Sequence, residues 1–580
     1  MLKSTGTKIM LALLAALLMA ASGWIYTRRP ERIEIATYVP ESALGYLEIA
    51  SLPQLVNQLS STNAWQQIAP AYGIADKLNN LEKFGEFGWL MGLAGSGEAA
   101  VFSQAQIAIA VTGLEVRGEA VKPRFALIAL AQGNEKGLKS VIEKRMPEIA
   151  VSLFGQAVKD QVEQAGLPVT IYRDANNSQR ELFSAQIKDA WILSNNVDSI
   201  RDCLMTILHR QPSMSNNFYL QKARPAVGNN PTAFGFVTAE GVKRLMRFGT
   251  YLAAGGIVGK AVLAGAVGEV FTEFSNRTCD GLVYSSSFQD GQFADRYSVL
   301  FKPELTDKLK TIVKANPQEP RALSLIPAAA REVTIYNVSN PSRTIDEIEK
   351  AISSRVDVAQ SFLLHQFILG MREAALGAKS PELTGAAIGD EIASFNLTKE
   401  PQNRVWLIAS RNQTMLARLA ENILTQFQDK RIANIARENF AGVEVLNSSE
   451  PSRGSAAFLG DFLVLGNRQQ ILQLIEAHRA GQNLKASQRY GLVKHSSPAA
   501  PIIGFSTARD ETNEMMVSLA RWFGQSVLPA NVAALDQLPL MASTTSLNEH
   551  GVYIESHSPF GNFPFLISLA DASINRSESK

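Results

Sequence analysis

The chain contains an internal duplication, and this feature limits its possible folds more than any other. Residues 185–195 read AQIKDAWILSN, and residues 457–467 read AFLGDFLVLGN. Asp189 and Asp461, Trp191 and Leu463, and Asn195 and Asn467 all share one offset of 272. Solenoid units recur about every 20–50 residues, so a repeat of this length predicts two whole homologous domains.

Further matches extend the duplication in the same order on both sides. The offset between partners falls along the chain from 280 to 260, which predicts longer loops in the first copy. The matched pairs are Arg124–Leu130 with Arg404–Ser410, Val169–Tyr172 with Val443–Leu446, Pro231–Phe236 with Ala500–Phe505, and Ser285–Gly291 with Thr545–Gly551. A weaker match between Tyr46–Ile49 and Val333–Tyr336 marks the start of each copy.

The order of short strands and helices predicts the fold class. Adjacent strands joined by turns and interrupted by helices favour an α+β fold with mainly antiparallel sheets, because a doubly wound parallel sheet would alternate strand and helix regularly. Residues 135–153 show helical spacing, and Asp290–Gly291 is typical of a hairpin turn. Asn195 and Asn467 lie where a strand gives way to a helix, so we expect a turn or cap there.

The amino-terminal segment predicts a membrane helix. Residues 9–26 carry no charged side chain, and 18 helical residues extend about 27 Å, enough to cross a hydrocarbon core. A cleaved signal peptide ending near Ala20–Ser22 is the alternative. We favour an uncleaved signal anchor because the run exceeds the usual h-region of about 7–15 residues and Trp24 and Tyr26 follow it. Lys3 and Lys8 then keep the start inside, and the body is extracytoplasmic, in the periplasm or at the cell exterior.

These observations predict seven segments. They are a cytoplasmic tail (1–8), a transmembrane anchor (9–26), a juxtamembrane linker (27–38), a first α+β repeat domain (39–302), a linker (303–325), a second α+β repeat domain (326–567) and a disordered tail (568–580).

Composition narrows the classes of partner. The chain is 46% hydrophobic and 19% charged, as is usual for a globular protein, and its net charge is +2. Nucleic-acid binding needs a concentrated basic surface, and the sequence has no run of Lys and Arg with interleaved aromatics. Nucleic acid is therefore excluded as an expected partner.

The two cysteines leave two alternatives open. Cys203 and Cys279 both lie in the first copy and would form one disulfide in an oxidising compartment. Two buried free thiols are the other interpretation. The absence of a CxxC motif excludes a zinc ribbon.

One segment of small apolar residues, 251–268, also has two interpretations. Gly255 and Gly259 have the spacing that lets helices approach closely in membranes. The segment could be a helical hairpin that contacts lipid or an apolar ligand. A tightly packed buried helix is favoured, because Lys260 interrupts the run and glycine in an exposed helix costs about 1 kcal/mol.

No catalytic, cofactor-binding or metal-binding residue is predicted. The six histidines have no metal-ligand spacing; they are His209, His365, His478, His495, His550 and His557. Gly92, Gly95 and Gly97 lack the lysine of a phosphate-binding loop and indicate a plain loop. Gly389–Glu391 is interpreted as a turn entering a strand, and Asp189 and Asp461 as turn aspartates.

The chain resembles an uncharacterised bacterial family. The residues that carry the resemblance are the N-terminal anchor, the opening Val39–Ile49 and the string Gly389–Ile392. Members are membrane-anchored, extracytoplasmic proteins with a large domain of unknown function. The resemblance implies location and architecture, and it transfers no catalytic residue.

The sequence favours a membrane-tethered binding or scaffold protein without catalytic activity. Expected partners are the membrane, through the N-terminal helix, and an envelope protein or apolar ligand. Two alternatives remain: a carrier that holds a lipid or other apolar ligand between the two repeat domains, and a hydrolase whose residues converge only in three dimensions.

Overall fold

The computed structural model describes most of the chain after residue 33. The described residues are 34–75, 101, 105–117, 120–131, 135–228, 231–255, 261–376, 381–400, 403–425, 434–449, 454–491, 500–522, 524–525 and 532–567. The expected anchor (9–26) and the C-terminal tail (568–580) lie outside these ranges. Within them, no helix is both long and apolar enough to cross a bilayer.

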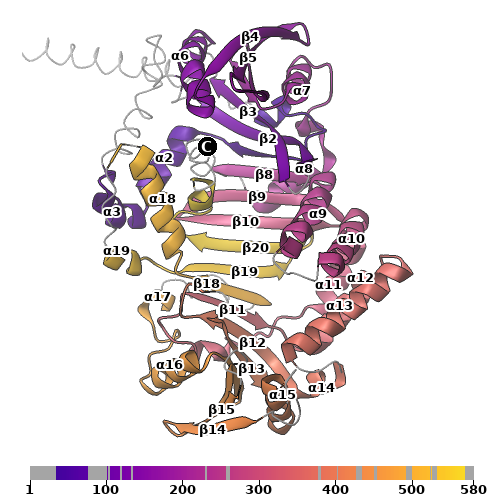
Figure 1. The fold of residues 1–580 in the computed structure, drawn as a ribbon, viewed down its shortest axis with the longest axis vertical. Coiled ribbons are helices and arrows are strands. Elements are labelled where there is room, and N and C mark those ends of the chain that lie inside the picture. Colours follow the sequence, from indigo (N-terminus) through magenta and orange to yellow (C-terminus); the bar gives the residue numbers. More distant parts are fainter. Residues whose placement is uncertain are drawn as a thin grey trace, which may run out of the picture.

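The strands of the described residues form one antiparallel sheet of twenty strands, and with the helices they give the expected α+β class (Figure 1). Strands β1–β10 form the first half: β1 Gly45–Ile49, β2 Ala105–Arg117, β3 Ala120–Ala131, β4 Ala157–Gln164, β5 Leu167–Asp174, β6 Asn177–Ile187, β7 Ala190–Ser194, β8 Ala233–Thr238, β9 Cys279–Gln289 and β10 Gln292–Phe301. Strands β11–β20 form the second half: β11 Glu332–Asn337, β12 Ile388–Asn396, β13 Val405–Ser410, β14 Ile435–Phe440, β15 Val443–Ser448, β16 Ser455–Leu459, β17 Phe462–Gly466, β18 Ile502–Ser506, β19 Met541–Leu547 and β20 Gly551–Ser558.

Both halves have the same strand order, read outward from the centre. The first half runs β10-β9-β8-β1-β2-β3-β7-β6-β5-β4. The second runs β20-β19-β18-β11-β12-β13-β17-β16-β15-β14. The antiparallel pair β10–β20 joins them. We call this junction the seam.

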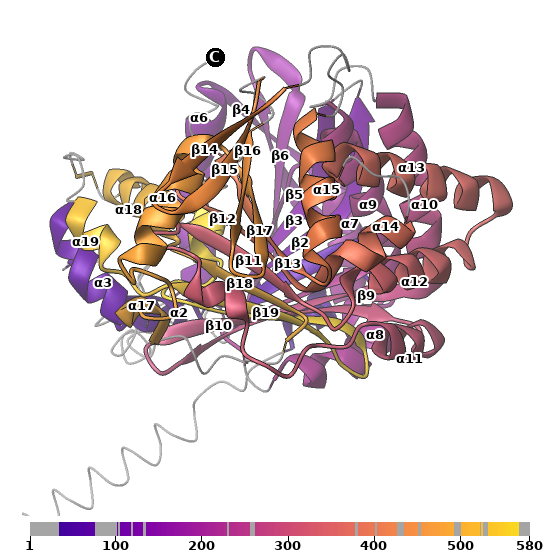
Figure 2. The same ribbon diagram turned by 90° about the horizontal axis from the view of Figure 1, so that it is seen from below.

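The sheet is strongly bent. Seen from below, the outer strands β4–β6 and β14–β16 rise on the same side of the central strands β10 and β19 (Figure 2). Strands twist by about 20–25° relative to their neighbours, so a sheet this wide must curve. The seam therefore lies at the base of the bend.

Helices gather in two groups at opposite ends of the central strands (Figures 1 and 2). One group contains α2 Leu52–Ser60, α3 Asn63–Ile68, α18 Arg509–Trp522 and α19 Val532–Asp536. The other contains α9 Ala239–Gly255, α10 Ala261–Thr278, α12 Pro341–Ser353 and α13 Val358–Leu376. Helix α3 packs on α19, and α10 packs on α13. Each group thus combines helices from both halves.

Local sequence explains where these helices begin. The Ser51 hydroxyl accepts a hydrogen bond from the Gln54 amide at the start of α2, and Thr62 caps α3 in the same way. Asn340 caps α12, with Pro341 as its first residue. Such caps satisfy amides that have no partner within the helix.

The remaining helices cover the sheet faces and connections. They are α6 Glu135–Phe154, α7 Val197–Ile207, α8 Phe218–Ala223, α11 Pro303–Ile312, α14 Pro381–Ala387, α15 Gln413–Thr425, α16 Arg468–Arg479 and α17 Gln488–Gly491, with 3₁₀ turns η1 Ile35–Tyr38, η2 Ala69–Tyr72, η3 Met214–Asn216, η4 Arg224–Val227 and η5 Arg321–Ser324.

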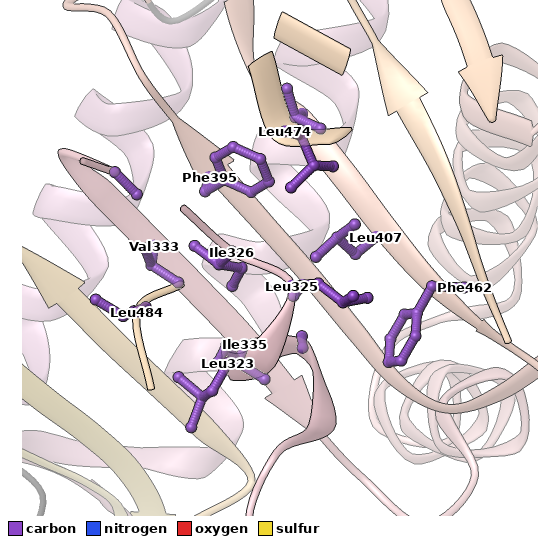
Figure 3. Packing of buried hydrophobic residues seen from close by; sticks show 14 of the residues in the cluster. Leu323, Leu325, Ile326, Val333, Ile335, Phe395, Leu407, Phe462, Leu474 and Leu484 are labelled. Carbon is purple, nitrogen blue, oxygen red and sulfur yellow. The ribbon is translucent and has the colours of Figure 1, made fainter. Parts of the chain in front are cut away.

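Each half encloses its own core. In the second half, apolar side chains from η5 and the residues after it pack on those of β11, β12 and β13; Figure 3 shows part of this cluster, including Leu323, Ile326, Ile335, Phe395 and Leu407. The first-half core has the same arrangement, with η1 in place of η5. A third cluster joins the halves through α3 and α18.

Several sequence predictions of local structure are confirmed. The helix expected at 135–153 is α6, and Asp290 and Gly291 form the turn between β9 and β10, both with positive φ. Asp189 and Asp461 each occupy the second position of a two-residue hairpin turn. Asn467 caps α16.

Asn195 lies in the connection between β7 and α7, as expected, but the residue that caps α7 is Asn196; Asn195 accepts a hydrogen bond from the Phe125 amide of β3. One local prediction was wrong. Gly389–Glu391 is not a turn, because β12 begins at Ile388. The body also starts before residue 39, since Ile35 and Ala36 are buried in the first-half core. The expected linker 303–325 contains α11 and η5.

Candidate functional site at the seam

The seam brings together charged residues that are far apart in the sequence. Arg296 of β10 lies directly opposite Glu555 of β20, and their guanidinium and carboxylate groups are 3.2 Å apart. Arg296 also donates to the Ser287 hydroxyl at 2.9 Å. Nε2 of His557 lies 3.4 Å from the Glu555 carboxylate. Hydrogen bonding from His557 and the charge of Arg296 lower the pKa of Glu555.

A buried carboxylate lies next to this pair on β10. Strand alternation turns Asp295 to the opposite face of the sheet from Arg296, and its exposure is only 2%. The Tyr284 hydroxyl donates to Asp295 at 3.0 Å, and the backbone N–H of Asn562 donates to the same carboxylate. Burial raises the pKa of Asp295, because the ionised form is poorly solvated there.

The chain after β20 crosses over Asp295. Gly561 has φ +57°, and a Cβ at this position would lie 2.9 Å from Asp295 Oδ2. Asn562 also donates to the Tyr297 hydroxyl. Glycine is therefore needed where the C-terminal segment approaches the carboxylate, because only glycine adopts this conformation freely and leaves the space open.

A second polar cluster lies in the second half, around Arg321. Its guanidinium contacts Asp390 at 2.8 Å and also bonds to Asp461. The buried Glu391 carboxylate accepts the backbone amides of Arg321 and Ala322 at 2.9 and 2.8 Å. Burial raises the pKa of Glu391, and these amides oppose the shift.

The Arg321 cluster was missed by sequence reasoning. Asp461 was interpreted as a turn residue only, and Asp390 and Glu391 as a turn. The signal in the sequence was weak, because Arg321 lies 69 to 140 residues from the acids that it joins. The cluster fixes η5 to β12 and to the turn between β16 and β17.

A third cluster fixes the first described residues to the body. Arg224 of η4 bonds to Glu34 at 2.6 Å and to the buried Glu48 of β1. Its guanidinium also lies over the Phe234 ring, 4.6 Å from the centroid. Burial raises the pKa of Glu48, and Arg224 opposes the shift.

The other sequence candidates do not converge. His365 pairs with Glu349, far from His557 along the chain, and His495 lies outside the described residues. Cys203 and Cys279 are both buried free thiols, so the disulfide alternative is wrong for this structure. Within the described ranges, no three His, Cys, Asp or Glu side chains are placed to hold a metal ion.

Most of the glycine-containing candidate segments lie outside the described residues. Gly92, Gly95 and Gly97 are not described. In the segment 251–268, α9 ends at Gly255 and α10 begins at Ala261, while Gly259 and Lys260 are not described. The side chains that would distinguish a lipid-contacting hairpin from a tightly packed buried helix are also outside the described residues.

One open cavity of about 280 Å³ has no residue of the three polar clusters in its lining. It is formed in the second half by the turn before β11 and the turn after α16, with Pro327, Ala477 and Gln482 in its wall. None of its lining residues is charged. The titratable groups with shifted pKa values at the seam and around Arg321 and Arg224 are therefore not gathered in this cavity.

In each cluster a guanidinium group pairs with one or more carboxylates, and these charge-assisted hydrogen bonds join elements that are distant in the sequence. The seam pair is largely shielded from water, whereas Arg321, Asp390 and Asp461 are partly exposed. No protein-family model, curated protein or solved structure matches the chain.

Proposed function

We propose that this protein is a membrane-tethered, extracytoplasmic binding or scaffold protein without catalytic activity, built from two homologous domains that the seam joins into one platform. The observation that carries this proposal is the continuous sheet across β10 and β20, with the Arg296–Glu555 pair at its centre. A scaffold protein has to hold its binding surfaces at a fixed distance and angle from one another. A continuous sheet does this, whereas two domains joined by a hinge would move independently.

The identical strand order of the two halves supports the duplication. Equivalent loops also make equivalent contacts. Pro40 forms an isolated bridge with Ser213, and Pro327 forms one with Asn483. The neighbouring hydrogen bonds, Met214 amide to Val39 carbonyl and Leu484 amide to Ile326 carbonyl, both measure 2.7 Å. These equivalent contacts support the proposal that the two halves are homologous.

The helix groups support a single rigid body. Trp65 and Ile68 of α3, in the first half, share a buried cluster with Met515, Met516 and Ala520 of α18, in the second. On the opposite side α10 of the first half packs on α13 of the second. Separating the halves would expose both clusters as well as two strand edges, which is costly.

The tether rests on the apolar run 9–26. The test uses the full chain expressed in bacterial cells. We expect it to stay in the membrane pellet after alkaline carbonate extraction, and its body to be digested by protease added to intact spheroplasts. Recovery in the carbonate supernatant, or protection of the body from protease, would contradict the proposed location.

The scaffold role is tested by site-specific photo-crosslinking in native membranes. A photoreactive residue replaces the exposed Phe362 of α13, and a matched control replaces Phe293, whose exposure is 0%. We expect position 362 to capture the same envelope component in repeated experiments and position 293 to capture none. Failure of position 362 and of further exposed positions to capture a reproducible partner would argue against a scaffold.

A further inference from the structure

The point where the described chain enters the body is fixed. Glu34 is bonded to Arg224 at 2.6 Å, and the next residues, Ile35 and Ala36, are buried in the first-half core. Arg224 follows directly after α8, Phe218–Ala223. The entry point therefore lies beside the carboxyl end of α8.

Helix α8 exposes two aromatic rings at its other end. Phe218 is 67% exposed and Tyr219 is 38% exposed, and their rings meet edge to face with centroids 5.5 Å apart. Leu220 and Ala223 are buried, so the helix is held firmly against the core. Asn217 caps it, and the Tyr219 hydroxyl bonds to Asp280. Folding thus holds the Phe218 ring, and one side of the Tyr219 ring, exposed to water, while the Tyr219 hydroxyl is bonded to Asp280.

The length of chain before Glu34 limits the distance to the bilayer. The apolar run ends at Tyr26, so seven residues, 27–33, separate it from Glu34. The eight Cα-to-Cα steps from Tyr26 to Glu34 span at most about 29 Å. Beyond Glu34 lie the side-chain bridge to Arg224 and helix α8, which adds about 9 Å at 1.5 Å per residue. The connecting segment is therefore short enough for α8 to lie at the membrane surface.

We propose that Phe218 and Tyr219 form a second membrane contact, inserted into the headgroup layer of the bilayer that holds residues 9–26. This proposal rests on the tether in the proposed function. Tyrosine rings favour this layer, and phenylalanine is one of the residues with which interfacial helices enter it. Lys222, exposed on the same helix, and Arg28, Arg29 and Arg32 of the connecting segment complement anionic phosphate groups. Two contacts on one side of the body orient the platform above the membrane.

The exposed apolar residues of α13 provide the matched control. Val358 is 88% exposed and Phe362 is 62% exposed, yet both belong to the second half. No short chain segment ties them to residue 26, so exposure alone does not place them at the bilayer.

The test uses the full chain in vesicles of phosphatidylcholine with phosphatidylglycerol. An environment-sensitive fluorophore is attached to Phe218→Cys, or to Val358→Cys as the control. The parent chain, whose two thiols are buried, measures background labelling. We expect lipid-borne nitroxide to remove about half of the emission at position 218 and little at 358, as insertion into the headgroup layer requires. A water-soluble quencher should instead reduce the emission more at position 358 than at position 218.

The outcomes separate this inference from the proposed function. A chain that does not float with the vesicles overturns the tether itself. A chain that floats while position 218 is quenched no more than 358 overturns only the aromatic contact. Replacing Lys222 with Glu should reduce quenching at 218 in vesicles that contain phosphatidylglycerol but not in phosphatidylcholine alone. An equal reduction in both would contradict the role assigned to charge.

Discussion

Arg296 and Glu555 face each other across the seam although they lie 259 residues apart in the sequence. Their side chains are 17% and 26% exposed, so the pair is largely shielded from water. Replacing Arg296 with Ala should lower the free energy of unfolding by about 1–3 kcal/mol, because the carboxylate keeps its burial and loses a charged partner. Urea denaturation measures the change.

A double-mutant cycle with Glu555→Gln isolates the pair. The exposed pair Arg343–Glu347 on α12 is the control and should show much weaker coupling. Because the pKa of Glu555 is lowered, the stability it contributes is present above its ordinary pKa of 4.5 and is lost as pH falls through the folded-state pKa. Equal coupling at the two sites would show that the seam pair has no special role.

Gly561 should tolerate no side chain. Gly561→Ala forces a left-handed alanine and places its Cβ 2.9 Å from Asp295 Oδ2 and 3.1 Å from Phe293 Cβ. Gly460 is the matched control: its φ is +59°, and nothing lies within 4 Å of its Cβ position. Gly460→Ala should cost about 1–2 kcal/mol from the backbone alone. Gly561→Ala should cost about 1–3 kcal/mol more, from overpacking. Similar losses in thermal or urea unfolding would mean that the C-terminal segment does not press on Asp295.

Asp295 should make stability depend on pH. Its folded-state pKa is raised by burial, so the native state binds the proton more tightly than the unfolded chain does. Its contribution is therefore full below the ordinary pKa of 3.8 and is lost as pH rises through the folded-state pKa. Asp295→Asn keeps an acceptor for the Tyr284 hydroxyl but cannot ionise. The variant should therefore lose this part of the dependence of unfolding free energy on pH. The measurement is the difference in unfolding free energy between wild type and variant from pH 3 upward. A difference that does not change with pH would rule out this assignment.

Met516 of α18 should couple the two halves. It is fully buried in the cluster with Trp65 and Ile68 of α3, and Met516→Ala should cost about 2–5 kcal/mol. Hydrogen exchange in α2 and α3 of the first half should then accelerate. Leu419→Ala, in the separate cluster under α15, serves as the control and should accelerate exchange mainly around α15. If Met516→Ala leaves α2 and α3 unchanged, the helix groups do not link the halves.

Cys203 and Cys279 should be unreactive in the folded protein. Burial raises their pKa values to about 12 and about 11, so the reactive thiolate is scarce at neutral pH and reagents cannot reach the sulfur. A chromogenic disulfide reagent should release no colour from the native chain and two equivalents after unfolding in urea. Rapid reaction before unfolding would place at least one thiol at the surface.

The segments that the sequence predicted well depend on local interactions. The α6 helix follows from apolar residues at helical spacing, and the turns at Asp189, Asp290 and Asp461 follow from turn chemistry between strands. Asn195 shows the limit of this reasoning. The strand-to-helix position was correct, but the choice between Asn195 and Asn196 as cap depends on which side chain β3 engages.

By itself the sequence determined the α+β class, the antiparallel hairpins and the order of elements, because spacing, turn residues and caps act within a few residues of chain. Only the tertiary structure decided that β10 meets β20, that α3 packs on α19, and that Arg321 joins Asp390 and Asp461. These contacts join residues tens to hundreds of positions apart. Any arginine could pair with any carboxylate until the sheet fixes which ones are buried side by side. The seam therefore had no signal in the sequence, although strand pairing, shared burial and opposite charge all meet there.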